Sequence, residues 1–240
     1  MVSKELKLSR QPSGEPEIFH SLQGEGHSIG TPTVFLRLAL CNLTCVWCDT
    51  KYTWDWGNFD PKTEILPLTS EDIEERILRY DCPHLVITGG EPMMQQDALA
   101  PLAFSLIKGR GFYIEVETNG TLAPNADMEH AVSQWNVSPK LANSGVDADK
   151  REIAESLTAF ATSEKAYFKF VLSQPADVEE VLTLVDLYEI QQQRVILMPQ
   201  GTTRKAIEEG SQWVADLCTK HGFRFSSRMH ILLWGDKRGR

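Results

Sequence analysis

The sequence predicts an α/β fold in which about six parallel strands form a partial, open βα barrel. Apolar, β-rich runs alternate along the 240 residues with helical patterns, an order typical of βαβ units. Several of these runs are apolar almost throughout, as expected of strands covered on both faces. A complete barrel of eight units takes about 250 residues, and about thirty N-terminal residues and a cysteine-rich loop leave too little chain for one. The barrel is therefore expected to be incomplete.

The predicted strands are short segments rich in β-branched and aromatic residues. They span residues 33–40, 84–88, 112–118, 135–137, 167–172 and 194–198. Ligands of parallel sheets bind at the carboxyl ends of the strands, so the loops that follow these segments are expected to carry the site.

Four helices are predicted from apolar residues three or four positions apart. One starts after Thr202 or Thr203 and stops at Gly222, and another is predicted to begin at Asp177 with a capping box completed by Glu180. The apolar stripes of the four helices are Ile73 and Ile77; Leu99, Leu102, Leu106 and Ile107; Val178, Val181, Leu182 and Val185; and Ile207, Val214 and Leu217.

The composition indicates one domain over residues 1–240 that acts in the cytoplasm. The net charge is -9, which argues against nucleic acid as a partner, and the basic end DKRGR is interpreted as a solvated tail. The N-terminal residues lack the apolar stretch of a signal peptide, and no run suits a membrane span. Five cysteines, an odd number in a reducing compartment, favour metal binding or redox chemistry over disulfides.

Three of the cysteines lie together in ALCNLTCVWCDT, directly after the first predicted strand. Cys41, Cys45 and Cys48 have the spacing C-x-x-x-C-x-x-C. A structural zinc site needs four ligands, for which His20 or His27 could supply the fourth. A cubane iron-sulfur cluster normally takes four thiolates, so three leave one iron with an open coordination position, as catalysis requires. Cys82 and Cys218, isolated in sequence, are predicted to be packed thiols.

A second motif, LVITGGEPMMQQ, ends a predicted strand in two glycines and an acid. Gly89 and Gly90 let the backbone approach a ligand closely, and Glu91 offers an anion to a cation. A plain strand-to-helix turn is the alternative.

Together, the cysteine spacing, the aromatic residue Trp47 before Cys48, and the TGGEP segment resemble the radical S-adenosylmethionine superfamily. The resemblance implies a [4Fe-4S] cluster whose unique iron binds the amino and carboxylate groups of S-adenosylmethionine. Reductive cleavage of this cofactor then yields a 5'-deoxyadenosyl radical that abstracts hydrogen from the substrate. An external one-electron donor such as flavodoxin or ferredoxin is also implied.

The segment EIFHSLQGEGHSIGTPTVFLRLALC resembles the 7-carboxy-7-deazaguanine synthase family, as do CDT, ETNGT, SPK, MPQG and HILLWG. This resemblance implies a lyase, typically homodimeric, of queuosine and 7-deazapurine biosynthesis. It contracts the ring of 6-carboxy-5,6,7,8-tetrahydropterin to 7-carboxy-7-deazaguanine with loss of ammonia, using catalytic S-adenosylmethionine. The open alternatives are an enzyme that activates glycyl-radical proteins and a non-catalytic zinc or iron-sulfur module.

Arg37 is a charged residue in an otherwise apolar strand, and its burial is costly unless it meets an anion. That anion is either the substrate carboxylate or a structural partner, Glu25 or Asp49.

The family resemblance also assigns roles to individual residues. An N-terminal segment, 15–31, is expected to bind substrate, and a C-terminal segment, 223–240, to close the site, with Trp234 and Gly235 as candidate contacts. Thr50 is the expected Mg²⁺ ligand, and Cys41, Cys45 and Cys48 hold the cluster. The expected substrate contacts are Leu22, Gln23, Gly24, Arg37 and Thr88, and the expected cofactor contacts are Trp47, Cys48, Asp49, Gly90, Glu91, Ser138, Pro139, Lys140, Met198, Pro199, Gln200 and Gly201.

Overall fold

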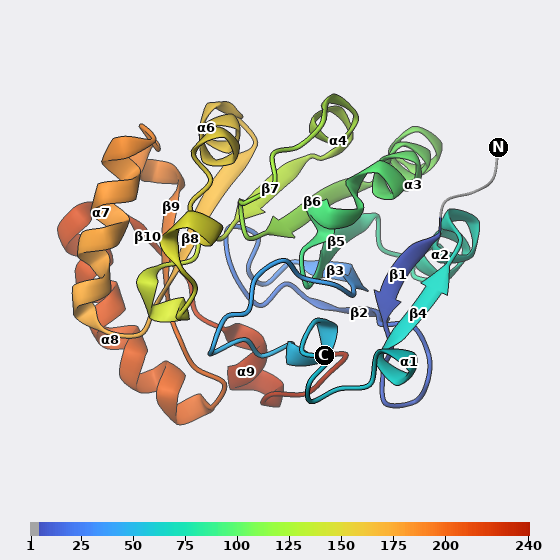
Figure 1. The fold of residues 1–240 in the computed structure, drawn as a ribbon, viewed down its shortest axis with the longest axis horizontal. Helices are drawn as coiled ribbons and strands as arrows, with labels where there is room; N and C mark the ends of the chain where they lie inside the picture. Colours follow the sequence, from blue (N-terminus) through green and yellow to red (C-terminus); the bar gives the residue numbers. More distant parts are fainter. Residues whose placement is uncertain (1–4) are drawn as a thin grey trace.

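A computed structural model describes residues 5–240, which form one curved, open sheet with helices along its outside (Figure 1). The strand order is β10-β9-β8-β7-β6-β5-β3-β1-β4, and β2, which is not part of this order, pairs with β3. The six predicted strands are confirmed, and each is parallel to the next. They are β3 (Pro32–Leu38), β5 (His84–Gly89), β6 (Tyr113–Thr118), β7 (Gln134–Val137), β8 (Ala166–Leu172) and β9 (Val195–Pro199).

Four short strands extend this parallel core, and the sequence analysis missed them. β1 (Leu6–Ser9) pairs antiparallel with β3 and β4 (Ile65–Leu68). β2 (Ile18–Leu22) runs antiparallel to β3, and β10 (Arg224–Phe225) extends the other edge. With two to five residues each, these strands are too short for a clear periodic pattern.

The four predicted helices are confirmed as α2 (Ser70–Ile77), α3 (Gln96–Arg110), α7 (Val178–Leu187) and α8 (Arg204–His221). The hydroxyl of Thr203 accepts a hydrogen bond from the amide of Ala206, 3.2 Å away, and α8 ends at Gly222 in the left-handed conformation. The remaining helices have four to nine residues each: α1 (Pro61–Glu64), α4 (Ala126–Ala131), α5 (Ala148–Arg151), α6 (Ala154–Thr162) and α9 (Met229–Trp234).

The capping box predicted for Asp177 and Glu180 is wrong. The box lies one turn earlier, in the short 3-10 helix η4 (Pro175–Asp177), where Gln174 is the N-cap and Asp177 its third residue. Glu180 instead accepts the amide of Ala142 at 2.8 Å and pairs with Arg151 at 2.6 Å. A ring-constrained proline at the first helical position favours the earlier start.

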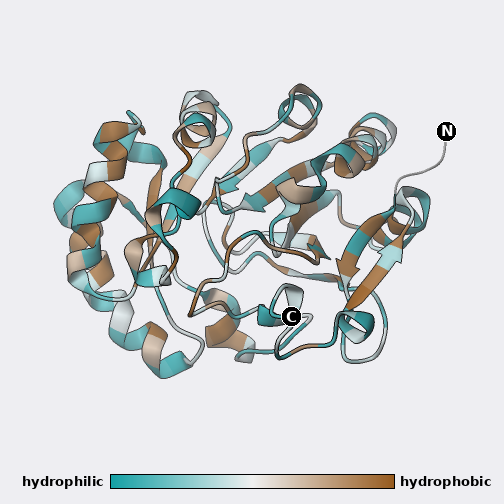
Figure 2. Cartoon of the chain, viewed as in Figure 1, coloured by the Kyte–Doolittle hydropathy of each residue, from teal (hydrophilic) through white to brown (hydrophobic). Residues whose placement is uncertain are grey.

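The core lies between the sheet and its outer helices. Trp135, Phe160, Phe168 and Phe170 are its largest fully buried side chains. Helices α7 and α8 mix hydrophobic and hydrophilic residues along their length, as amphipathic helices do (Figure 2). Over residues 5–240, no helix has the length and apolar character needed to cross a membrane.

Cys82 and Cys218 are both buried, as predicted for packed thiols. Each donates from Sγ to a backbone carbonyl: Cys82 to Pro32 at 3.4 Å and Cys218 to Arg224 at 3.3 Å.

Candidate active site

A cavity of about 220 Å³ lies at the carboxyl ends of the parallel strands. Each of the six parallel strands, β3 and β5 to β9, contributes a residue to it near its carboxyl end, and the cysteine loop after β3 closes one side. This is the edge on which parallel sheets bind ligands, as the sequence predicts.

The structure brings nearly all of the predicted site residues to this cavity. The exceptions are Glu91, Pro139 and Pro199, which are buried without lining it. Trp234 and Gly235 do not line it either, whereas Arg240 does. The predicted residues that line it are Leu22, Gln23, Gly24, Arg37, Cys41, Cys45, Trp47, Cys48, Asp49, Thr50, Thr88, Gly90, Ser138, Lys140, Met198, Gln200 and Gly201.

The three clustered cysteines all face the cavity, packed with Leu43 and Val146. The indole NH of Trp54 donates to Cys48 Sγ at 3.4 Å, and the amide of Leu43 to Cys41 Sγ at 3.5 Å. Burial raises the pKa of Cys41 to about 12. A thiol in such a place becomes a thiolate by binding a metal, so the donors fit an iron-sulfur cluster.

The zinc alternative has no support in the structure. Among residues 5–240, no three His, Cys, Asp or Glu side chains converge as ligands of a single ion do. His27 stacks on Tyr167, with ring centroids 3.8 Å apart, and His20 packs against Tyr80. Neither of these two proposed fourth ligands lines the cavity that the cysteines face.

The two glycines after β5 bring that strand end against the cysteine loop. Gly89 has φ +133°, a region that favours glycine. The amide of Gly90 donates to Leu38 O at 3.0 Å, and a Cβ at this position would lie 2.0 Å from Leu40 O. The backbone of Gly90 is thus in close contact with a neighbour, as the sequence predicts, and that neighbour is the backbone of Leu40 and Cys41.

Alanine at Gly90 is expected to displace the cysteine loop, because the added carbon collides with backbone rather than with a flexible side chain. We expect the Gly90→Ala protein to lose cluster content and about 2 kcal/mol or more of unfolding free energy. Gly109→Ala is the matched control, because Gly109 lies in α3 and its added Cβ would meet no atom within 4 Å besides its chain neighbours and the backbone of that helix. The Gly109→Ala protein should gain about 0.5–1 kcal/mol of unfolding free energy. Iron analysis and urea unfolding measure both effects, and equal stability of the two variants would contradict this account.

Glu91 does not line the cavity, and its predicted contact with the cofactor stays a prediction. It is fully buried and accepts hydrogen bonds from the amides of Asn119 (2.6 Å) and Met93 (2.9 Å) and from the hydroxyl of Thr118 (2.9 Å). Burial raises its pKa, opposed by these bonds. Glu91 thus ties the end of β5 to the end of β6, beside the site.

Arg37 has a structural partner, but neither of the two that the sequence suggested. Its Nε donates to Glu17 Oε1 at 2.9 Å, whereas Glu25 and Asp49 pair with Arg228. Within residues 5–240, the two Nη nitrogens of Arg37 have no hydrogen-bond partner, and its side chain lines the cavity. Burial opposes the charge of Arg37, yet the surrounding acidic groups keep its pKa above the usual value. The cavity is therefore lined by a charged guanidinium that bonds to the protein through its Nε alone.

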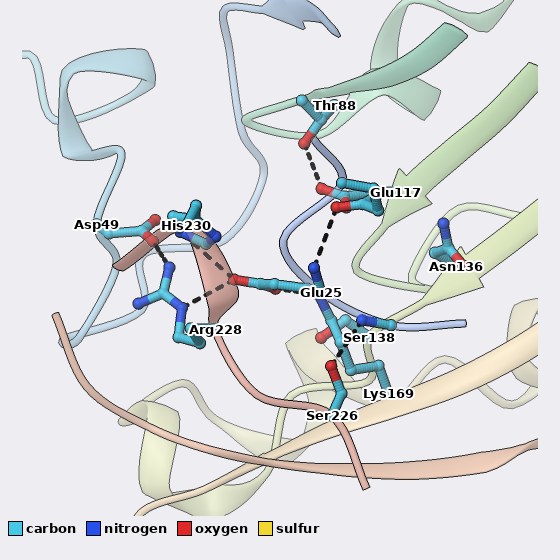
Figure 3. Close-up of polar contacts among 12 residues, drawn as sticks. Glu25, Asp49, Thr88, Glu117, Asn136, Ser138, Lys169, Ser226, Arg228 and His230 are labelled. Carbon is cyan, nitrogen blue, oxygen red and sulfur yellow. Dashed lines mark hydrogen bonds and ion pairs between the residues drawn. The ribbon is translucent and has the colours of Figure 1, made fainter. Parts of the chain in front are cut away.

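The sequence analysis missed a set of charged residues around this cavity. Glu117 in β6 accepts from Gln23 Nε2 at 3.1 Å. It also accepts from Thr88 Oγ1 at 2.7 Å (Figure 3). Lys169 in β8 pairs with Glu25. Both are charged residues in buried strands, the same signal that singles out Arg37. Asn136, Arg228 and His230 also line the cavity.

Arg228 joins the three segments that the sequence assigned to substrate and cofactor. Its Nε donates to Glu25 at 2.8 Å and its Nη2 to Asp49 (Figure 3). Its Nη1 donates to Gly201 O at 2.6 Å. Burial would raise the pKa of Glu25, but Lys169 and Arg228 hold it well below its usual value. For His230, burial is the main reason that the pKa falls below its usual value. Glu25 is therefore charged and His230 neutral at neutral pH.

A three-cysteine loop at the carboxyl edge of an open parallel sheet defines a radical S-adenosylmethionine protein. The model of the Radical SAM superfamily accordingly matches residues 38–148. A 7-carboxy-7-deazaguanine synthase of Pyrobaculum aerophilum is 41% identical over 226 residues, which are 93% of this chain and 96% of that protein. The chain belongs to the 7-carboxy-7-deazaguanine synthase family.

Other relatives agree with this assignment. A 7-carboxy-7-deazaguanine synthase of Halobacterium salinarum is 35% identical over 244 residues, covering 92% of this chain and 90% of that protein. The crystal structure of QueE from Escherichia coli matches with a TM-score of 0.68 and 26% identity, covering 94% of this chain and 95% of that one. Both matches extend over nearly the whole chain, far beyond the cysteine loop.

Proposed function

We propose that this protein is a 7-carboxy-7-deazaguanine synthase, a lyase that contracts 6-carboxy-5,6,7,8-tetrahydropterin to 7-carboxy-7-deazaguanine and releases ammonia. The observation that carries the proposal is that Arg37, whose two Nη nitrogens have no hydrogen-bond partner among residues 5–240, lines the same cavity as the three cysteines. A guanidinium with two free donors matches the geometry of a carboxylate. An enzyme that activates glycyl-radical proteins has no evident use for such a group.

The segment 15–31 would hold the heterocycle of the substrate. Glu117 accepts hydrogen bonds from both Gln23 and the hydroxyl of Thr88, so one half-buried acid orients two of the predicted substrate contacts. Leu22 and Gly24 line the cavity on either side of Gln23. Backbone groups and an amide suit the alternating donors and acceptors of a pterin.

The cofactors would lie where the cysteine loop closes the cavity. When bound, the [4Fe-4S] cluster and S-adenosylmethionine supply the hydrogen abstraction that starts the reaction. Cys41, Cys45 and Cys48 would hold the cluster. Lys140 hydrogen-bonds Ser138 Oγ at 2.9 Å and lies 5.7 Å from the ring centroid of Trp47, so three predicted cofactor contacts hold one another in place.

Thr50 would contribute to a Mg²⁺ site with the substrate carboxylate, since magnesium prefers oxygen ligands and keeps several waters. Its Oγ1 is 3.6 Å from Cys48 Sγ, so the two proposed metal sites are adjacent. Reduction by flavodoxin or ferredoxin, a homodimer, a cytoplasmic location and one domain over residues 1–240 remain parts of this proposal.

The test is anaerobic reconstitution followed by turnover with S-adenosylmethionine, Mg²⁺, a reductant and 6-carboxytetrahydropterin. We expect about four irons per chain and formation of 7-carboxy-7-deazaguanine with ammonia. The control without substrate should yield neither product. An intact, reducible cluster with no deazaguanine product would refute the proposal.

A further inference from the structure

The carboxylate of Glu17 is shared between two arginines from distant parts of the chain. It is fully buried, and its Oε1 accepts from Arg37 Nε at 2.9 Å and from the hydroxyl of Tyr52 at 3.2 Å. Its Oε2 accepts from Arg238 Nε at 3.2 Å. Each oxygen of Glu17 thus serves a different arginine.

Arg238 is held firmly in this position. Its guanidinium stacks over the ring of Tyr52, 3.5 Å from the centroid, and its Nη1 donates to Glu64 Oε2 at 3.0 Å. Its Nη2 donates to the backbone carbonyl of Arg10. Figure 1 accordingly shows the C-terminal end of the chain close to α1, which ends at Glu64. The prediction that this basic segment is a solvated tail is wrong for Arg238.

The sharing of Glu17 decides how Arg37 can be used. A carboxylate and a guanidinium prefer two parallel hydrogen bonds, one to each oxygen. With Oε2 engaged by Arg238, Glu17 binds Arg37 through Nε alone, and both Nη nitrogens stay free at the cavity. Without Arg238, Oε2 would be available to an Nη of Arg37, and the two groups could close into a bidentate pair.

We propose that Arg238 is a positioning and specificity-determining residue for the substrate carboxylate. It occupies the second oxygen of Glu17 and so keeps the donors of Arg37 for the ligand. The inference rests on the proposed function, because it requires a ligand whose carboxylate binds Arg37. It assigns no contact between Arg238 and the substrate itself.

The test compares two ligands, 6-carboxytetrahydropterin and tetrahydropterin without the carboxyl group, on three forms of the reconstituted protein. These forms are the parent, Arg238→Gln and Lys237→Gln. Lys237 is exposed on the same segment and loses the same charge, so it is the matched control. For Arg238→Gln we expect the Kd of the carboxylated ligand to rise about tenfold or more, with the Kd of the other ligand and of S-adenosylmethionine unchanged. Lys237→Gln should match the parent.

An equal weakening of both pterins, or no change, in Arg238→Gln would overturn the inference while leaving the proposed function intact. Failure of the parent to prefer the carboxylated pterin would refute the carboxylate contact at Arg37, and with it both proposals. Arg238→Lys provides a second variant that keeps the charge. Because lysine can still donate to Glu17 Oε2, it should restore part of the preference, and no restoration in a folded, cluster-loaded Arg238→Lys protein would also count against the inference.

Discussion

Cys45→Ala is expected to lower the iron content of the reconstituted protein from about four atoms per chain to almost none, and to abolish product formation. Cys45 is buried and lines the cavity with Cys41 and Cys48. In the described part of the chain, the other two cysteines lie in the core, each bonded to a backbone carbonyl. The lost thiolate therefore has no substitute. Iron and sulfide analysis with the absorption spectrum of the cluster measures the effect.

Cys82→Ala is the matched control, because Cys82 is similarly buried but lies in the core. This variant should keep the cluster and the activity and lose about 1 kcal/mol of stability. Full iron loading of Cys45→Ala, or loss of the cluster from Cys82→Ala, would contradict the assignment of the three-cysteine loop.

Arg37→Ala is expected to lower kcat/KM for the carboxytetrahydropterin by roughly 100-fold to 1000-fold, because about 3–4 kcal/mol of charge-assisted bonding to the carboxylate is lost. Glu17 keeps its bonds from Tyr52 and Arg238, so the variant leaves no unpaired buried charge. Cluster content and the affinity for S-adenosylmethionine should stay unchanged. Steady-state kinetics and ligand titration provide the measurement.

Arg76→Ala serves as the control for removing a paired arginine. Arg76 bonds Glu15 at 3.0 Å in a surface pair in which Arg76 is half-buried and Glu15 exposed, and its loss should change kcat/KM less than twofold. If Arg37→Ala instead reduced soluble yield or iron content, Arg37 would have a structural role through Glu17, and the substrate contact would be refuted.

The parallel core could be predicted from sequence because each strand is apolar along its length and each helix follows with its own start and stop. The cysteine loop and Arg37 could be located because unusual residues stand out within such segments. Lys169 and Glu117 carry the same signal, a charge in a buried strand, and the same reasoning would have found them.

Other features depend on contacts between segments that are far apart in sequence. The partners of Arg37 and Arg228 lie up to about two hundred positions away, as the bond from Arg228 to Glu25 shows, so no local pattern identifies them. Glu91 follows two glycines in a motif that suggests a ligand, yet its carboxylate accepts hydrogen bonds from two backbone amides. Where backbone donors lie close to a buried acid, they satisfy it before any ligand binds.

The most direct test of the central claim is an anaerobic crystal structure of the reconstituted protein with S-adenosylmethionine and 6-carboxytetrahydropterin. The account predicts a cluster on Cys41, Cys45 and Cys48 and the substrate carboxylate within hydrogen-bond distance of the Nη nitrogens of Arg37, with Glu17 still bonded to Arg37 Nε and to Arg238. A carboxylate bound elsewhere in the cavity, with Arg37 closed on both oxygens of Glu17, would contradict it.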